Sequence, residues 1–218
     1  MTGVGSGPSR WLLLALISGF ILVADQATKY LAVAHLTSAF ASVNAATPGE
    51  QLSAFVSQKD LLERGLTTGP VHVFESWFQL RYTQNRGAAW GFLSGARAGF
   101  RVPFFHLVTL AALAFITAYY RKLEEGQRYL QVSLALLLGG ALGNGLDRVL
   151  RSYVIDFIDW HFRDPNWAAP SRHWPTFNIA DCGVSIGLVL LFLEMLFAKQ
   201  PTGKGPPATA QAGSDGAP

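Results

Sequence analysis

The sequence predicts an all-α membrane protein with four transmembrane helices. Half of its 218 residues are hydrophobic and only 14% are charged, with a mean hydropathy of +0.26, whereas a soluble domain carries about 25% charged residues. The charges fall between four apolar runs, at about residues 11–36, 102–120, 129–146 and 180–198. Each run is long enough to cross a hydrocarbon core of about 30 Å as a helix, and a helix satisfies its own backbone groups in lipid.

The first run could also be a cleaved signal peptide, because Arg10 precedes it and Ala39-Phe40-Ala41 resembles a cleavage site. Against this interpretation, Asp25 and Lys29 lie between the apolar core and that site. They are four residues apart, so they share one helix face and most simply form an ion pair. We therefore interpret the run as a retained span.

Residues 37–101, between the first two spans, form the largest extramembrane insert. Thr47-Pro48-Gly49-Glu50 has the capping Thr, first-position Pro and third-position Glu of a helix start. One apolar stripe follows, and Gly65 supplies a stop signal; the stripe consists of Leu52, Phe55, Val56 and Leu62. This pattern predicts a short amphipathic helix that lies on the protein or the membrane surface.

A strand is predicted next, because Phe78, Leu80 and Tyr82 alternate with polar residues. It leads into the segment Asn85-Arg86-Gly87-Ala88-Ala89-Trp90. The third apolar run ends in the glycine-rich segment 139–148, whose small residues favour close helix contacts. Within that segment, Asp147 beside Arg148 is most simply an ion pair at a helix end.

The two ends of the chain, residues 1–10 and 199–218, are rich in Gly, Pro, Ala and Ser and are predicted to be tails, the second of them disordered. The short loop 121–128 holds three basic residues, which predicts that this loop and both termini are cytoplasmic. The opposite loops carry more basic residues in total, but long loops weigh less in this rule. The net charge of +3 is scattered, which favours contact with membrane phospholipids over a nucleic-acid partner.

Because the chain is predicted to cross the membrane four times, the first and third spans end at the same membrane face at which the second and fourth spans begin. Nearly all of the unusual polar residues gather there, and ionisable groups next to spans usually indicate function. They are Asp25, Lys29, Asn85, Asn144, Asp147, Arg148, Asp156, Asn178 and Asp181.

Asp156 and Asp181 are the strongest catalytic candidates. Each is embedded in apolar neighbours without an adjacent cation in the sequence. If the two carboxylates converge, one can remain ionised and activate water while the other stays protonated and polarises a carbonyl. The alternative is two unrelated carboxylates at helix ends.

Other chemistries have less support. The sequence has no His-Glu-x-x-His, no Gly-x-Ser-x-Gly and no phosphate loop, and its five histidines show no metal-binding spacing, so we predict no metal and no cofactor. Cys182, the only cysteine, is interpreted as a packing residue. Two rivals remain: a small membrane transporter, and a magnesium-dependent lipid phosphotransferase that would use Asp147, Asp156 and Asp159.

Taken in order, five segments resemble the lipoprotein signal peptidases (signal peptidase II) of bacterial inner membranes, over about residues 11–198. They are Asp25-Gln26-Ala27-Thr28-Lys29, Asn85-Arg86-Gly87-Ala88-Ala89-Trp90, Gly143-Asn144-Gly145-Leu146-Asp147-Arg148, Val154-Ile155-Asp156-Phe157 and Phe177-Asn178-Ile179-Ala180-Asp181. Each segment alone is weak, but their combination is highly specific.

The resemblance implies an aspartic endopeptidase without a metal, with a small β-cradle and a periplasmic-side helix beside the four spans. Its substrate is a prolipoprotein whose cysteine carries diacylglycerol, and it cuts just before that cysteine. The implied catalytic pair is Asp156 and Asp181. The supporting residues are Asp25, Lys29, Asn85, Gly87, Asn144, Asp147, Arg148 and Asn178. We also expect a monomer with its active site near the periplasmic face.

One departure from the family pattern stands out. The chain has extra residues at about Ser38–Gly69, which include the predicted amphipathic helix, and the stretch Arg163–Pro175 is also a candidate for extra length. The resemblance does not assign a role to either segment.

Overall fold

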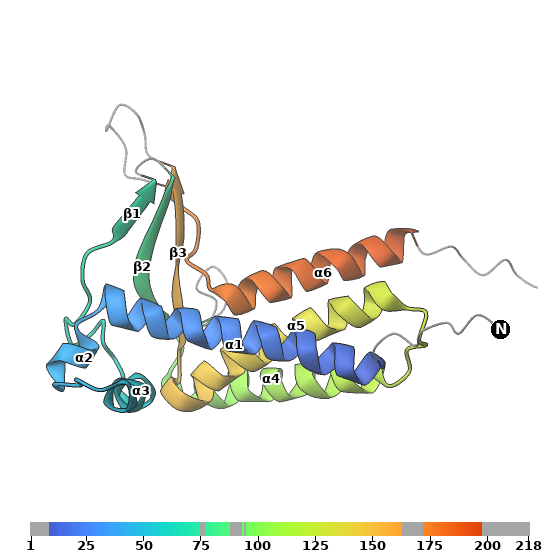
Figure 1. The fold of residues 1–218 in the computed structure, drawn as a ribbon, viewed down its shortest axis with the longest axis horizontal. Coiled ribbons are helices and arrows are strands. Elements are labelled where there is room, and N and C mark those ends of the chain that lie inside the picture. Colours follow the sequence, from blue (N-terminus) through green and yellow to red (C-terminus); the bar gives the residue numbers. More distant parts are fainter. Residues whose placement is uncertain (1–8, 75–76, 88–92, 94, 163–171, 198–218) are drawn as a thin grey trace, which may run out of the picture.

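The computed structural model describes residues 9–74, 77–87, 93, 95–162 and 172–197. Four long helices lie side by side, and an antiparallel sheet extends from one end of them (Figure 1). The helices are α1 (Arg10–Leu36), α4 (Ala98–Tyr120), α5 (Arg128–Arg151) and α6 (Ile179–Phe197). All four are long and apolar enough to cross a membrane, which confirms the predicted fold class. The predicted tails lie almost wholly outside the described residues.

Helix α5 is the central helix of the four. In its most apolar stretch 56% of the residues are buried, compared with 11–17% in the other three helices. Glycines allow α5 to lie close to its neighbours. A Cβ atom at Gly140 would lie 2.5 Å from the carbonyl oxygen of Ala180 on α6, and a Cβ atom at Gly139 would lie 2.8 Å from the carbonyl oxygen of Ser18 on α1. The outward faces of α1, α4 and α6 expose large apolar side chains such as Phe20, Leu107 and Phe192, as a lipid-facing surface does.

The end of α5 differs from the prediction. The helix continues beyond residue 146 to Arg151 and stops at Ser152, which has the left-handed φ of 66°. Arg151 and Asp147 are four residues apart and form an ion pair across the last turn, which stabilises the extension. Asp147 and Arg148 therefore lie near the end of the helix, as predicted, but the helix extends beyond both of them.

The sheet has the order β1-β2-β3-β4 and every neighbouring pair is antiparallel. Its strands are β1 (Val71–Phe74), β2 (Phe78–Asn85), β3 (Val154–Phe162) and β4 (Arg172–His173). The strand predicted around Leu80 is β2, but a register shift between Leu80 and Thr83 interrupts its alternation, and the polar Gln79 is buried. Strand β3 was not predicted; because of it, Asp156 lies on a strand and not at a helix end.

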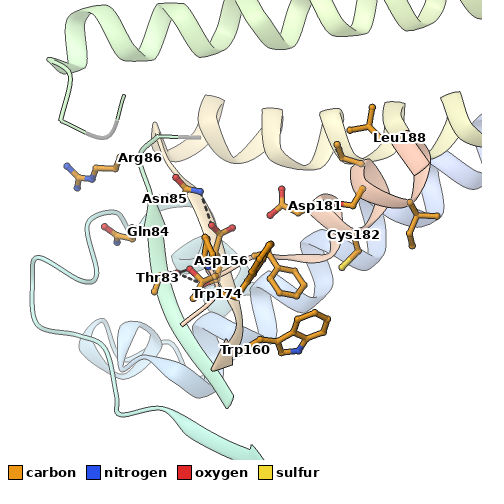
Figure 2. Close-up of a pocket in the computed structure, with 16 residues that line it drawn as sticks. Thr83, Gln84, Asn85, Arg86, Asp156, Trp160, Trp174, Asp181, Cys182 and Leu188 are labelled. Carbon is orange, nitrogen blue, oxygen red and sulfur yellow. Dashed lines mark hydrogen bonds between the residues drawn. The ribbon is translucent and has the colours of Figure 1, made fainter. Parts of the chain in front are cut away.

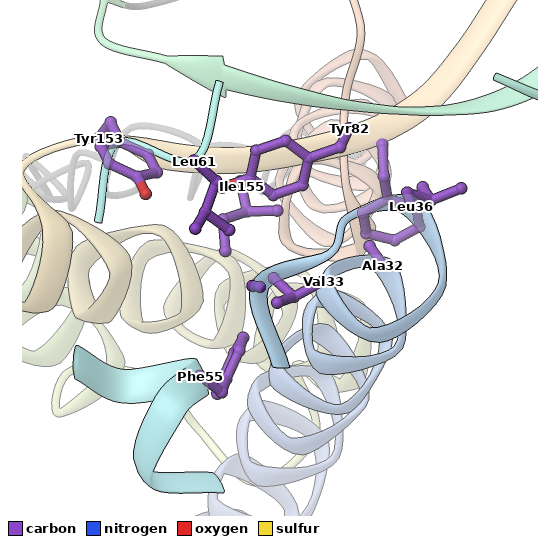
Figure 3. Packing of buried hydrophobic residues seen from close by; sticks show 10 residues of the cluster. Ala32, Val33, Leu36, Phe55, Leu61, Tyr82, Tyr153 and Ile155 are labelled. Atoms are coloured by element: carbon purple, nitrogen blue, oxygen red, sulfur yellow. The ribbon is translucent and has the colours of Figure 1, made fainter. Parts of the chain in front are cut away.

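The predicted helix in the insert is α3 (Pro48–Ser57), and its capping box between Thr47 and Glu50 is present. The single apolar stripe was wrong, since the helix ends before Leu62 and before Gly65. Leu52 and Val56 are exposed, whereas Phe55 is buried in the core between the helices and the sheet. That core joins Val33 and Leu36 of α1, Phe55 of α3, Tyr82 of β2 and Ile155 of β3 (Figure 3). A four-residue helix, α2 (Ala39–Ser42), precedes α3.

Candidate active site

Asp156 and Asp181 line one pocket of about 1080 Å³ at the junction of the sheet and the helices (Figure 2). Asp156 is the third residue of β3, and Asp181 lies in the first turn of α6. The even-numbered residues 156 and 160 of β3 both line the pocket, as residues on one face of a strand do. The predicted convergence of the two carboxylates is therefore confirmed.

Asn178 contacts both aspartates. Its side-chain amide donates to Asp156 Oδ1 at 2.7 Å, and its backbone N–H donates to Asp181 Oδ2 at 3.1 Å. In return, the Asp181 backbone N–H donates to Asn178 Oδ1 at 3.0 Å. The last two bonds form a reciprocal cap at the start of α6, so the orientation of the Asp181 side chain is fixed by helix capping.

Two further amides complete the hydrogen bonding of the pair. Asn85, at the end of β2, donates to Asp156 Oδ2 at 3.0 Å, and Asn144 on α5 donates to Asp181 Oδ1 at 2.7 Å. Each carboxylate thus accepts from at least two protein donors while still lining the pocket. These contacts bring the predicted supporting residues Asn85, Asn144 and Asn178 into direct contact with the pair.

Lys29 is fully buried next to the residues that hold the pair. Its Nζ is 2.8 Å from Asp25 Oδ2 and 2.8 Å from Asp147 Oδ2, and it donates to Asn144 Oδ1 at 3.2 Å. The predicted ion pair between Asp25 and Lys29 is confirmed. The second carboxylate, Asp147, comes from a different helix, and sequence spacing could not reveal this contact.

The two carboxylates bound to Lys29 each hold the backbone next to one pocket aspartate. Asp25 Oδ1 accepts from the backbone N–H of Ala180 at 2.9 Å, and Asp147 Oδ2 accepts from that of Ile155 at 3.0 Å. Ala180 precedes Asp181 and Ile155 precedes Asp156. A single buried lysine therefore connects the backbone positions of both aspartates.

The predicted pairing of Asp147 with Arg148 is wrong. Adjacent residues point away from each other on a helix, so Asp147 bonds Arg151 at 2.9 Å. Arg148 instead donates to the carbonyl oxygen of Gly87 at 3.3 Å and stacks on the ring of Phe105, 4.8 Å from its centroid. Arg148 thereby holds Gly87, a predicted supporting residue within the segment that begins at Asn85.

The pKa of Asp156 is raised to about 8, first because burial disfavours its charged form and second because the negative charge of Asp181 is near. The amide donors Asn85 and Asn178 and the Lys29 charge oppose this rise. Near neutral pH, Asp156 is therefore suited to holding a proton. This is the protonation state that the predicted general-acid role requires.

The three carboxylates considered above as magnesium ligands, those of Asp147, Asp156 and Asp159, do not gather at one site. Asp159 lies at an odd position of β3, on the face opposite Asp156, and it clusters with His161 and His173. His161 and His173, which have no metal-binding spacing in the sequence, meet across β3 and β4. Residues 88–90, which complete the Asn85 segment, lie outside the described residues.

Several residues that line the pocket were not predicted. Trp160, Trp174 and Thr176 form one wall, and Cys182 with Ile186 and Leu188 on α6 forms another. Trp160 could have been found from strand alternation once β3 was recognised. Trp174 and Thr176 could not, because only the fold brings them into the same pocket as Asp156.

Comparisons with known proteins agree with this architecture. Residues 17–197 match the family described as Signal peptidase (SPase) II. A protein named lipoprotein signal peptidase from Anaeromyxobacter sp. (strain Fw109-5) is 48% identical over 85% of each chain. One from Bacillus velezensis is 34% identical over 85% of this chain and 95% of its own. A solved bacterial membrane enzyme structure matches with a TM-score of 0.60 and 27% identity, covering 88% of this chain and 93% of that chain. The chain is a multi-pass membrane protein that belongs to the signal peptidase II family.

Proposed function

We propose that this protein is an aspartic endopeptidase that removes signal peptides from prolipoproteins whose cysteine carries diacylglycerol, cutting just before that cysteine. The family and the names of the relatives support the substrate class. The chemistry rests on one observation: Asp156 and Asp181 line the same pocket and are both bonded to Asn178. Such a pair shares one proton, as in other aspartic proteases.

In the proposed mechanism, Asp156 holds the shared proton and Asp181 is ionised. Asp181 accepts a proton from a water molecule as its oxygen attacks the scissile carbonyl carbon. Asp156 donates its proton to the carbonyl oxygen, which gives a neutral tetrahedral intermediate. Collapse of that intermediate breaks the C–N bond, and Asp181 delivers its proton to the departing amine. Asp156 regains its proton from the intermediate hydroxyl, so the pair returns to its starting state.

The pocket suits a substrate that is partly peptide and partly lipid. Its sheet side presents polar residues such as Thr83, Gln84 and Asn85, which can bond a peptide backbone. Its α6 side presents Ile186 and Leu188, which are exposed on a helix apolar enough to span a membrane. A lipidated cysteine would lie with its acyl chains along α6 and its peptide along β2 and β3.

The proposed location follows from the same arrangement. The pocket is lined by residues of the sheet and of the start of α6. The sheet and the insert lie together at one end of the four helices (Figure 1). We place this end at the periplasmic face of the bacterial inner membrane, with both termini in the cytoplasm, and we propose that the monomer is sufficient for cleavage.

The test is cleavage of a diacylglyceryl-modified prolipoprotein by the purified protein in lipid nanodiscs. Asp156→Asn and Asp181→Asn should each abolish cleavage while the circular dichroism spectrum is retained, because asparagine has the shape of aspartate but cannot shuttle the proton. Glu194→Gln, another carboxylate on α6 that lies outside the pocket, is the matched control and should cleave normally.

Two outcomes would overturn the proposal. Substantial cleavage by either aspartate variant would remove the catalytic pair. Loss of wild-type cleavage in EDTA, with recovery on adding magnesium, would favour the metal-dependent phosphotransferase class, for which phosphoryl transfer is the direct assay.

A further inference from the structure

A cluster of three potential metal ligands lies on the sheet, outside the proposed catalytic pair. Asp159 and His161 lie two residues apart on one face of β3, and His173 on β4 is the register partner of His161. This face is opposite to the one on which Asp156 and Trp160 line the pocket. Asp159 and His161 are 0% and 4% exposed, whereas the His173 side chain is 33% exposed.

The geometry of the cluster is close to that of a metal site. One ligand atom from each residue lies within 4.8 Å of the other two. His173 Nδ1 is 2.8 Å from Asp159 Oδ1. Zinc binds histidine nitrogen and carboxylate oxygen at about 2.0–2.2 Å, so tetrahedral ligands lie about 3.3 Å apart. Side-chain shifts of about 1 Å would therefore bring the three atoms around one ion.

The surroundings of Asp159 leave one of its oxygens for an ion. Asp159 Oδ2 accepts from Gln79 Nε2 at 2.6 Å and pairs with Arg81 Nε at 3.3 Å. His173 Nδ1 lies 2.8 Å from Oδ1 and 3.1 Å from Oδ2, and it is the one side chain among the described residues that bonds Oδ1. Hydrogen bonds to the second oxygen of a ligating carboxylate are typical of metal sites, because they hold the ligand in place. Gln79 and Arg81 fill that role from the neighbouring strand β2.

We propose that Asp159, His161 and His173 bind a divalent zinc ion. Two imidazoles and one carboxylate suit zinc and disfavour magnesium or calcium, which prefer oxygen ligands. Water supplies a fourth ligand from the exposed side of His173. The ion takes the position between His173 Nδ1 and Asp159 Oδ1, and any proton on that nitrogen is released to solvent on binding.

The site would fix one wall of the pocket. Zinc would tie β3 to β4. Trp160 lies on the opposite face of β3, and Trp174 directly follows β4 and donates its backbone N–H to the Trp160 carbonyl oxygen at 2.7 Å. Both tryptophans line the pocket (Figure 2). A zinc-loaded sheet should therefore bind substrate more tightly. This consequence, unlike zinc binding itself, rests on the proposed peptidase function.

The first experiment measures zinc binding by the full-length protein, purified without a histidine tag and stripped with EDTA before dialysis. Calorimetric titration with ZnCl2 should show one saturable site, and X-ray absorption should show two imidazoles and oxygen ligands. His173→Gln should weaken binding by about 10–100-fold or more. His35→Gln, which removes an exposed histidine on α1, is the matched control and should bind as wild type does.

Zinc affinity unaffected by His173→Gln, sulfur in the coordination shell, or saturable binding of MgCl2 at the same site would overturn the proposal. A readout on folding supports these measurements: zinc should raise the Tm of wild type and of His35→Gln, but not that of His173→Gln. Equal Tm increases in all three proteins would also overturn it.

Cleavage kinetics test the link to the pocket. Zinc should lower the KM for the lipidated substrate without changing kcat, and His173→Gln should abolish this response. An unchanged KM despite zinc binding overturns the link to the pocket. Absence of any cleavage by stripped and by zinc-loaded wild type would count against the proposed function and leave the zinc site standing.

Discussion

The side-chain amide of Asn178 donates to Asp156 Oδ1 at 2.7 Å, and the same residue caps the helix that carries Asp181. One residue therefore serves both a structural and a chemical purpose. The cap satisfies a free N–H group at the start of α6, and the amide fixes the carboxylate on the neighbouring strand. The Asn178 side chain therefore links the two aspartates directly.

The two purposes of Asn178 can be separated by substitution. Asn178→Ser keeps a capping oxygen, whereas Asn178→Ala does not, and both lose the amide that reaches Asp156. We expect both variants to lower kcat by about 10²–10³-fold, the usual effect of removing an oriented donor. Serine should retain about 1 kcal/mol of stability that alanine loses. Thermal unfolding and single-turnover cleavage measure the two effects. A serine variant with normal kcat would make Asn178 only a cap.

The pH dependence of cleavage follows from the raised pKa of Asp156, about 8. The proposed active form holds a proton on Asp156, so kcat/KM should fall as pH rises through about 8. Asn85 donates to Asp156 and stabilises its charged form, so Asn85→Ala should raise this pKa and move the alkaline limb to higher pH. A pH–rate profile from about pH 5 to 10 tests both points. An alkaline limb that moves downward in the variant would contradict this assignment.

The four spans could be predicted from the sequence because the bilayer imposes a length and an apolar composition on every helix that crosses it. The capping box of α3 and the pair of Asp25 with Lys29 are local, and they follow from spacing alone. Strand β3 was missed because Val154–Phe162 follows an apolar run directly and no turn signal was recognised between them. Recognising the left-handed residue Ser152 required the structure.

The remaining parts of the site are non-local. Asp147 meets Lys29 from another helix, and Trp174 reaches the pocket only because β4 pairs with β3. The partner of Asp147 within its own helix was nevertheless available from the sequence, since Arg151 lies at the i+4 position and Arg148 does not. In the same way, Asp159 and His161 share a strand face, a pattern that becomes visible only once β3 is known.

Close packing around Asp25 gives a third prediction. A Cβ at Gly143 would lie 2.6 Å from Asp25 Oδ2, so Gly143→Ala must displace the carboxylate that holds the backbone of Ala180. We expect a loss of about 1–3 kcal/mol in stability, as for other overpacked sites, together with a lower kcat. Gly19→Ala is the matched control, because no other part of the described residues, apart from the neighbouring helix backbone, lies within 4 Å of its Cβ position. Tm and cleavage rate should be measured for both variants. Equal behaviour of the two would show that the site tolerates movement of Asp25.

The final prediction concerns Lys29, which neutralises a buried cluster together with Arg151. Two positive and two negative side chains balance there, the negative ones being Asp25 and Asp147. Lys29→Met leaves an uncompensated buried negative charge, which should cost about 3–5 kcal/mol. Lys59→Met, at an exposed lysine of the insert, should leave Tm and cleavage unchanged.

A double variant separates charge balance from positioning. Lys29→Met with Asp25→Asn restores neutrality, so its Tm should recover in part. Its cleavage rate per folded molecule should stay low, because Asn144 and Asp147 still lack the ammonium group that joins them. Measurement of Tm alongside kcat and KM distinguishes the two effects. If kcat per folded molecule returned to the wild-type value along with Tm, the role of Lys29 would be limited to charge balance. Its role in positioning the two aspartates, through the backbone of Ala180 and Ile155, would then be refuted.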